Sequence, residues 1–188
     1  MSPSDRVGWA TLLSLALFAI IVAIAAHCRA DDPRLVDRLV IVQSAYQSNL
    51  DTPVDARELA EAIAAIPRVN ASWAALVLTI AAHESALSAR IARGECKRYE
   101  CDGGRASGLY QSHKNKLNAA VWGSTDIRVQ TLEAARALRS GFYTCKANGL
   151  GPNWVRLTIN GYAGKRCDAQ WRGLEERIAT YERIRGRL

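Results

Sequence analysis

The segment from Trp73 to Ala92 constrains the fold of this chain more than any other part, because its apolar residues recur with the period of an α-helix. Up to residue 82 the segment is apolar nearly all round, which predicts a helix buried at the centre of a helical domain. Six residues at alternating spacings of four and three share one helical face: Trp73, Val77, Ile80, Glu84, Leu87 and Ile91.

Glu84 is the only charged residue on this face. A carboxylate that faces inward is costly unless it is paired, hydrogen-bonded or at the rim of a cleft. Partial burial also disfavours the charged form, and a carboxyl group that stays protonated near neutral pH can act as a general acid. The pattern is therefore compatible with a catalytic Glu84, and also with a glutamate at the rim that pairs with Arg90 or another base.

Residues 1–30 differ in composition from the rest of the chain. Residues 7–28 carry no formal charge and are mostly apolar, a length that can span a bilayer as a helix. Small residues follow the apolar core, with Ala-Ile-Ala at 23–25 and Cys-Arg-Ala at 28–30, where a signal peptidase could cut. We therefore expect an exported protein whose leader is either a cleaved signal peptide or a retained hydrophobic anchor helix.

The whole chain carries a net charge of +7. The leader contributes +1 through Asp5, Arg6 and Arg29, so residues 31–188 keep +6. A basic exported domain suits an anionic partner such as a cell-wall polymer or a membrane surface. The basic residues are scattered along the sequence, which argues against a dedicated nucleic-acid-binding stripe.

Four cysteines follow the leader: Cys96, Cys101, Cys145 and Cys167. An even number of cysteines in an exported chain favours disulfides. Of the three pairings, Cys96–Cys101 with Cys145–Cys167 is preferred, because each bond then joins nearby segments. No paired C-x-x-C spacing indicates a metal site, and we expect neither a metal nor another cofactor.

The remaining sequence predicts further helices and no strand pattern of any length, so the fold class is mainly α. Either Asn70 or Ser72 can cap the central helix. The expected helices cover residues 33–48, 54–66, 126–147, 154–160 and 168–185, with a polar, glycine-rich loop at 94–107. The expected inner face of the helix at 126–147 is Leu132, Ala135, Leu138, Phe142 and Cys145.

Three short motifs follow one another along the chain: His83-Glu84-Ser85, Gly108-Leu109-Tyr110-Gln111 and Asn160-Gly161-Tyr162-Ala163-Gly164. Together they resemble the lytic transglycosylase family with the goose-type lysozyme-like fold. In that family Glu-Ser ends a central helix, Gly-Leu-x-Gln follows, and a Tyr-Asn-Ala-Gly turn comes third. The resemblance covers roughly residues 70–185. It divides the chain into the leader at 1–30, helices packed on the domain at 31–69, and a lysozyme-like catalytic domain at 70–188.

The chain departs from the family pattern in two places. The spacing from Glu84 to Gln111 is longer, and the excess falls in the loop between Cys96 and Cys101, where a surface insertion is tolerated. In the third motif the asparagine and the tyrosine are displaced from their usual order.

The resemblance implies cleavage of the β-1,4 bond between N-acetylmuramic acid and N-acetylglucosamine in peptidoglycan. Glu84 matches the single catalytic acid and base. It would protonate the glycosidic oxygen and then take the proton of the sugar's C6 hydroxyl, which gives a 1,6-anhydro end. Tyr162 would hold Glu84 through its hydroxyl or line a subsite. The motif residues expected to bind substrate are Ser85, Gly108, Leu109, Tyr110, Gln111, Asn160 and Tyr162.

Most glycosidases use a second carboxylate. Glu95, Glu100 and Asp102 lie in the loop after the central helix and are better explained as solvated charges. A single acid fits the transglycosylase reaction, but a hydrolytic muramidase, which uses water in place of the C6 hydroxyl, stays open. A non-catalytic wall-binding protein of the same fold also stays open, although it has no need of Glu84.

Other enzyme classes are disfavoured by the sequence. The zinc-protease motif H-E-x-x-H needs histidine where Leu87 stands, and His83 is expected to be structural. We expect a periplasmic or extracellular protein, anchored in the inner membrane if residues 7–28 are retained. Its expected partner is the peptidoglycan glycan strand, with an envelope or secretion apparatus as a further partner and no nucleic acid.

Overall fold

The computed structural model describes residues 32, 34–47, 52–97, 99, 101–115, 118–147 and 153–188. This part of the chain is mainly helical, which confirms the predicted fold class. Its helices are α2 (Leu35–Gln47), α3 (Ala56–Ala64), α4 (Ala71–Ser85), α5 (Ala89–Ala92), α6 (Ile127–Ala147), α7 (Trp154–Tyr162) and α8 (Arg172–Arg185). The other elements are a 3₁₀ turn, η1 (Asp102–Gly104), and a short antiparallel hairpin of β1 (Ala106–Ser107) and β2 (Ser112–His113).

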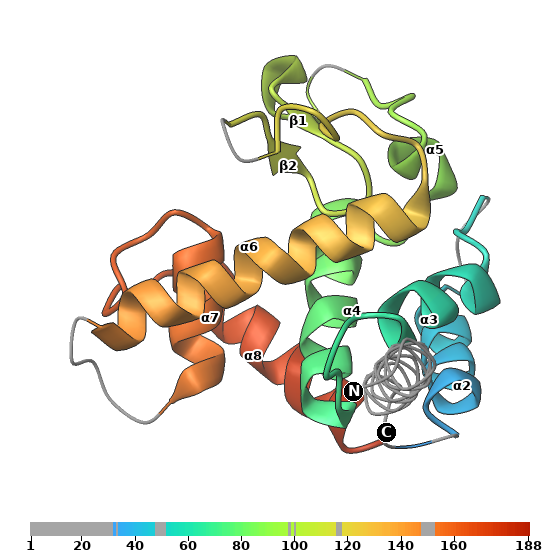
Figure 1. Cartoon of the computed structure of the whole chain (residues 1–188), viewed down its shortest axis with the longest axis horizontal. Helices are drawn as coiled ribbons and strands as arrows, with labels where there is room; N and C mark the ends of the chain where they lie inside the picture. The colour runs from blue at the N-terminus through green and yellow to red at the C-terminus, as the bar shows by residue number, and fades with distance from the viewer. Residues whose placement is uncertain are drawn as a thin grey trace, which may run out of the picture.

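Helix α6 runs across the whole molecule, between the hairpin region and most of the other helices (Figure 1). The hairpin and α5 lie on one side of α6, whereas α2, α3 and α8 lie on the other, and α7 crosses behind α6. Helix α4 passes behind α6 from one side to the other. The C-terminal end of α4 therefore reaches the region where the two sides of the molecule meet.

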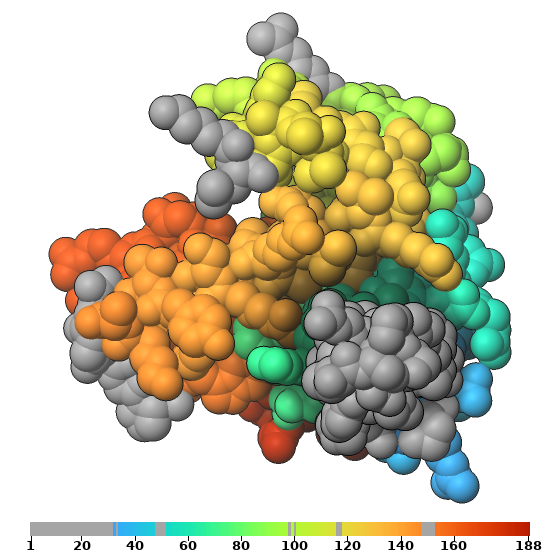
Figure 2. All heavy atoms as spheres, in the orientation of Figure 1, coloured from blue at the N-terminus to red at the C-terminus, as the bar shows by residue number. Residues whose placement is uncertain are grey.

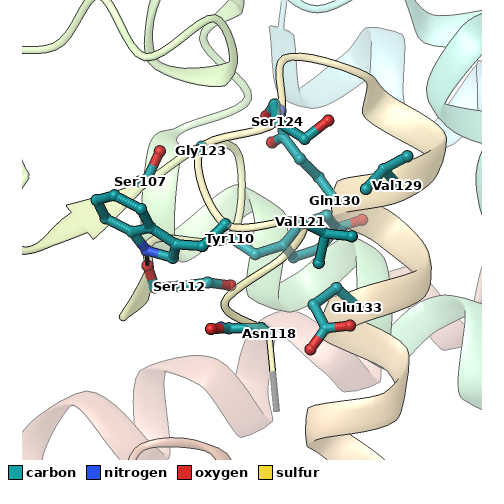
Figure 3. A pocket seen from close by; sticks show the side chains of 12 residues that line it. Ser107, Tyr110, Ser112, Asn118, Val121, Gly123, Ser124, Val129, Gln130 and Glu133 are labelled. Atoms are coloured by element: carbon teal, nitrogen blue, oxygen red, sulfur yellow. Dashed lines mark hydrogen bonds between the residues drawn. The ribbon is translucent and has the colours of Figure 1, made fainter. Parts of the chain in front are cut away.

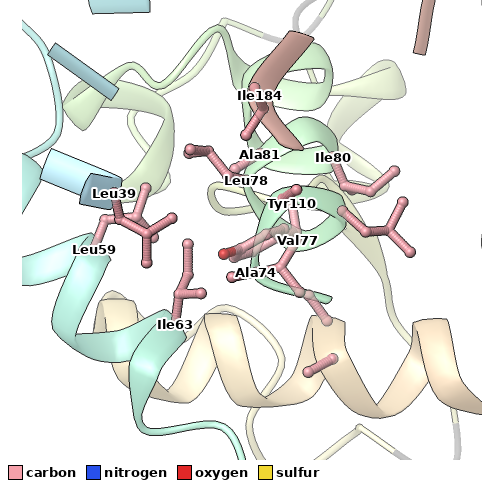
Figure 4. Close-up of a cluster of buried hydrophobic side chains, with 14 of the residues drawn as sticks. Leu39, Leu59, Ile63, Ala74, Val77, Leu78, Ile80, Ala81, Tyr110 and Ile184 are labelled. Atoms are coloured by element: carbon pink, nitrogen blue, oxygen red, sulfur yellow. The ribbon is translucent and has the colours of Figure 1, made fainter. Parts of the chain in front are cut away.

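Helix α4 is the buried centre of the fold. All of its residues from Ala74 to Ala81 are buried, because this segment is apolar nearly all round. Asn70 begins the helix, since its side-chain oxygen accepts a hydrogen bond from the Trp73 backbone N–H at 3.0 Å. One of the two predicted caps is thereby confirmed. Figure 4 shows side chains of α4 packed in one cluster with those of α2 and α3: Leu39, Leu59 and Ile63.

The prediction of a single helix from Trp73 to Ala92 is wrong. Helix α4 ends at Ser85, and Ala86 and Leu87 both adopt positive φ angles, of 50° and 60°. The Ser85 hydroxyl accepts a hydrogen bond from the Leu87 N–H at 3.2 Å. The chain then pairs with the segment before α3, because the Val54 N–H donates to the Leu87 carbonyl at 2.8 Å. Tertiary pairing thus interrupts the predicted helix at residues 86–88, between α4 and α5, and Glu84 lies in the last turn of α4.

Helices α6 and α7 cross with almost no space between their backbones. A Cβ atom built on Gly161 would lie 2.5 Å from the Gly141 Cα atom, and one on Gly141 would lie 2.8 Å from the Gly161 carbonyl carbon. A disulfide between Cys145 and Cys167 joins the end of α6 to the segment after α7. These features hold α7, which carries the third motif, against α6.

The predicted inner face of α6 is only partly correct. Ala135, Leu138 and Cys145 are buried as expected, whereas Phe142 is half-buried and Leu132 is 36% exposed. The buried face is instead continued by Thr131, Ala134 and Gly141. At Gly141 the small residue is explained by the close approach of α7, since a Cβ there would lie 2.8 Å from the Gly161 carbonyl carbon.

The predicted leader at residues 1–30 lies outside the described residues. Among the residues that the structure does describe, no helix has both the length and the apolarity needed to cross a membrane. Helices α2 and α3, in the segment 31–69, contribute Leu39 and Ile63 to the same core as α4.

Candidate functional site

A cleft of about 500 Å³ opens where the end of α4, the segment after β1, and helices α6, α7 and α8 meet. Figure 2 shows the surface indented between the lobe that carries the hairpin and the α6–α7 pair. A second hollow of about 640 Å³ continues along α6 and α7 and shares Glu133 and Tyr162 with the cleft. The side chains that matter for the argument below are Glu84, Gln111, Glu133, Tyr162, Trp171 and Arg177.

Glu84 projects from the last turn of α4 into this cleft, and its side chain is 23% exposed. An Arg177 guanidinium nitrogen, Nη2, donates a hydrogen bond to Glu84 Oε1 at 2.7 Å. This ion pair joins the last turn of α4 to α8 inside the cleft. The base that pairs with Glu84 is therefore Arg177 and not Arg90. Arg90 instead donates a hydrogen bond to the Glu95 carbonyl at 2.8 Å.

Arg177 was not predicted as a site residue, because it lies 93 residues from Glu84 in the chain. Its guanidinium carbon lies 5.0 Å from the centre of the Trp171 ring, and Nη1 donates to the Gly173 carbonyl at 3.1 Å. Its side chain is only 16% exposed. Only the packing of α8 against α4 brings Arg177 next to Glu84. The residue spacing within a single helix cannot predict such a pair.

Tyr162 and Gln111 are the two predicted substrate-binding residues that line the cleft. The Tyr162 hydroxyl donates to the Tyr110 carbonyl at 2.6 Å, so it does not hold Glu84 as one prediction had it. Burial, and secondly the charge of Glu84, raise the pKa of Tyr162 well above its usual value. Gln111 has a positive φ of 47°, and its amide donates to the Gly108 carbonyl at 3.0 Å.

The other five predicted substrate-binding residues are buried and do not line the cleft: Ser85, Gly108, Leu109, Tyr110 and Asn160. Two of them, Gly108 and Tyr110, line a small neighbouring pocket of about 20 Å³ instead, and substrate binding by these five residues stays a prediction. Ser85 donates to the Ala81 carbonyl at 2.9 Å and shapes the end of α4. The Tyr110 hydroxyl bonds to Thr131 at 3.1 Å, and burial raises the pKa of this tyrosine.

Gly108 and Asn160 have structural roles that explain their residue types. Gly108 has a φ of 73°, and a Cβ there would lie 2.5 Å from Gln130 Oε1, which accepts from the Leu109 N–H. Asn160 donates to the carbonyls of Cys167 and Ala169, both at 3.0 Å. Both residues therefore fix the backbone of the loops around the cleft.

Glu133 is a carboxylate of the cleft that the sequence reasoning missed. It projects from α6, its side chain is 16% exposed, and it lines both hollows. Its described ion pair is with Arg136, at 3.6 Å, on the same helix. Figure 3 shows Glu133 beside Asn118 at a small pocket of about 20 Å³ between the hairpin and α6.

Two of the three acidic loop residues considered from the sequence, Glu95 and Asp102, do not line the cleft. Glu95 pairs with Arg93 at 2.9 Å, and Asp102 pairs with Arg105 at 3.0 Å. Both carboxylates are about half exposed, which fits solvated loop charges. Glu100 lies outside the described residues.

His83 is held within the fold. Its Nε2 atom lies 3.0 Å from the Thr180 hydroxyl of α8. Burial, and secondly the charge of Arg177, lower the pKa of His83 below its usual value. Within the described ranges, no group of three or more histidine, cysteine, aspartate or glutamate side chains is placed to hold a metal ion.

The two disulfides have the predicted pairing, Cys96–Cys101 and Cys145–Cys167. They fit a protein that matures in an oxidising compartment outside the cytosol. The first lies in the segment between the first two motifs, and the second joins the end of α6 to the segment after α7.

The chain matches no family model, and comparison with curated proteins and with solved structures finds no similar protein. The geometry of the cleft is therefore the basis for the function proposed next.

Proposed function

We propose that the chain is a lytic transglycosylase with a lysozyme-like helical fold, which cleaves the β-1,4 bond between N-acetylmuramic acid and N-acetylglucosamine in peptidoglycan. One observation carries the proposal. Glu84 ends the buried central helix inside a cleft that Gln111 of the second motif and Tyr162 of the third motif also line. Three motifs separated in sequence thus contribute to one cavity large enough for part of a sugar chain.

In the proposed reaction Glu84 gives its proton to the bridging oxygen as the bond from that oxygen to C1 of muramic acid breaks. The C6 hydroxyl oxygen of the same sugar then forms a bond to C1, and its proton returns to the Glu84 carboxylate. The products are a free 4-hydroxyl on one side and a 1,6-anhydro ring on the other. Neither water nor a cofactor enters the balance, so one acid–base group suffices.

The charge and export features support the same proposal. Residues 31–188 carry +6, which attracts a polyanionic wall polymer. Two disulfides fit an exported domain. We place the protein in the periplasm or outside the cell, with an envelope or secretion apparatus as a further partner. Retention of residues 7–28 would tether it to the membrane.

Glu133 favours a second candidate function, hydrolysis by the same fold. A hydrolytic muramidase needs a carboxylate that activates water or stabilises the sugar cation. Glu133 lines the same cleft as Glu84 and can serve in that role. On the primary proposal, Glu133→Gln leaves the rate of anhydro-product formation within about threefold. A loss of about 100-fold or more would assign the reaction to a two-carboxylate mechanism.

The deciding experiment is mass spectrometry of the soluble products released from purified peptidoglycan by the full chain in mild detergent. Glu84→Gln is the test variant, and Glu95→Gln is the matched control, since Glu95 is exposed and paired with Arg93. We expect muropeptides with 1,6-anhydro ends from the wild type and the control, and none from Glu84→Gln. Reducing ends would support the muramidase, and wall binding without products from any form would support a binding protein.

A further inference from the structure

A continuous set of contacts runs from the buried Asn160 to the Glu84 carboxylate. The Asn160 side-chain oxygen accepts a hydrogen bond from the Trp171 indole N–H at 2.7 Å. The Trp171 ring in turn carries the Arg177 guanidinium on its face, at 5.0 Å from ring centre to guanidinium carbon. Arg177 then holds Glu84 at 2.7 Å.

Arg177 engages only one oxygen of the carboxylate, Oε1. Among the described residues, none donates a hydrogen bond to the other oxygen, Oε2. Arg177 is itself restrained at two further points, by the Trp171 ring and by the Gly173 carbonyl, so its guanidinium has little freedom to follow a moving partner. The arrangement therefore distinguishes an anchored oxygen from a free oxygen on the same group.

Gly173 makes this arrangement possible. A Cβ at that position would lie 2.5 Å from the Trp171 ring atom Cζ3 and 2.8 Å from Arg177 Nη1. Both distances are shorter than real Cβ contacts, so a methyl group there must displace the ring or the guanidinium. The displaced atoms are side-chain atoms and not backbone, so α8 itself can remain in place.

We propose that Arg177 is a positioning residue that anchors Glu84 Oε1, so that Oε2 is the atom that transfers the proton, and that Asn160, Trp171 and Gly173 hold Arg177 in place. This inference rests on the proposed function of Glu84. When Glu84 gives up its proton to the bridging oxygen it becomes a carboxylate, and the guanidinium stabilises that developing charge. The third motif thus acts on the reaction through α8, since its asparagine is buried and does not line the cleft.

Gly173→Ala is the sharpest test, because alanine is the better helix former and the variant should not lose stability through α8. We expect kcat to fall at least tenfold while KM changes less than twofold and the midpoint of thermal unfolding does not fall. Gly186→Ala, at the other end of α8, is the control and should keep kcat. Wild-type kcat in Gly173→Ala would overturn the inference.

Arg177→Ala provides a second test that a purely structural role would not satisfy. The variant should lose at least tenfold in kcat and regain part of it when guanidinium ion is added at low millimolar concentration. Arg177→Lys should not restore full activity, because an ammonium group lacks the planar fork that both stacks and donates. Absence of guanidinium rescue in a folded Arg177→Ala protein would count against positioning through the ion pair.

A readout independent of turnover separates this inference from the proposed function. The two Nη nitrogens of Arg177 give distinct ¹⁵N NMR signals if the ion pair and the stacking restrain rotation of the guanidinium group. We expect distinct signals in the wild type and averaged signals in Glu84→Gln and Gly173→Ala. With no turnover but distinct wild-type signals, the anchoring of Oε1 stands and the function proposal fails. Averaged signals in the wild type refute the anchoring whatever the activity.

Discussion

Gly161→Ala tests whether the close crossing of α6 and α7 is the support of the third motif. A glycine in the interior of a helix normally costs about 1 kcal/mol relative to alanine, so at an open position this change would stabilise the protein. At Gly161 the new Cβ would lie 2.5 to 2.6 Å from three backbone atoms of Gly141. Backbone atoms cannot rotate away, so the two helices must move apart by about 1 Å to reach normal carbon–carbon separations.

The expected magnitude follows from these opposing effects. Overpacking typically costs about 1–3 kcal/mol, and the absence of a flexible neighbour places this case near the upper end. Subtracting about 1 kcal/mol of helix propensity leaves a net loss of about 2 kcal/mol. For a chain of this size that corresponds to a fall of roughly 4–8 °C in the midpoint of thermal unfolding. Because Tyr162 follows Gly161 and lines the cleft, kcat should also fall.

Thermal unfolding followed by circular dichroism measures the effect. Ser140→Ala is the matched control, since Ser140 is exposed on α6 beside Gly141. The control should shift the midpoint by less than about 2 °C, as surface substitutions usually do. A Gly161→Ala protein as stable as the wild type, or more stable, would refute the argument that backbone contact limits this crossing.

Three further predictions follow from other contacts. Because the pKa of His83 is lowered in the folded chain, the unfolded chain binds the proton more readily, so the free energy of unfolding should decrease as pH falls through about 6.5. Urea titrations at pH 7.5 and 5.5 should show this loss, and His83→Gln should reduce it. Replacing Cys145 and Cys167 by serine should lower the free energy of unfolding by about 3 kcal/mol, and replacing Cys96 and Cys101 should lower it by about 2 kcal/mol. The difference is expected because the Cys145–Cys167 bond closes the longer loop. Equal losses of stability in urea titrations would contradict this argument. Gly108→Ala should destabilise by about 2–3 kcal/mol, since it combines a positive φ with loss of the Gln130 contact, and a neutral effect on the urea midpoint would disprove it.

The features that depend on local pattern were predicted from the sequence. Apart from the central one, the predicted helices agree with the observed ones to within about four residues at each end. The Asn70 cap and the burial of α4 follow from residues within a few positions of each other. The cysteine pairing follows from proximity along the chain. Such features are local, so periodicity, capping chemistry and short loops are sufficient to predict them.

The structure departs from the local sequence pattern where distant segments compete for the same groups. Leu87 continues the helical pattern of α4, yet its carbonyl accepts a hydrogen bond from Val54, and this pairing ends the helix at Ser85. Asn160 and Tyr110 belong to motifs expected to bind substrate, but their side chains form hydrogen bonds within the fold, to Cys167 and Trp171 and to Thr131. A sequence motif indicates which residues belong to a site. It does not show which of them line the cleft and which support the surrounding backbone.

Glu84 illustrates what the sequence pattern reveals and what only the tertiary structure reveals. Its place in an apolar face marked it from the sequence alone as an unusual carboxylate, because burying a charge is costly. The partner that offsets that cost was decided by tertiary structure: Arg177 from α8 reaches Glu84, and Glu133 from α6 reaches the same cleft, only through helix packing. The sequence by itself determined the helices and the candidate acid, since these depend on local spacing. The partners of that acid depend on contacts between distant segments, and only the folded chain brings those together.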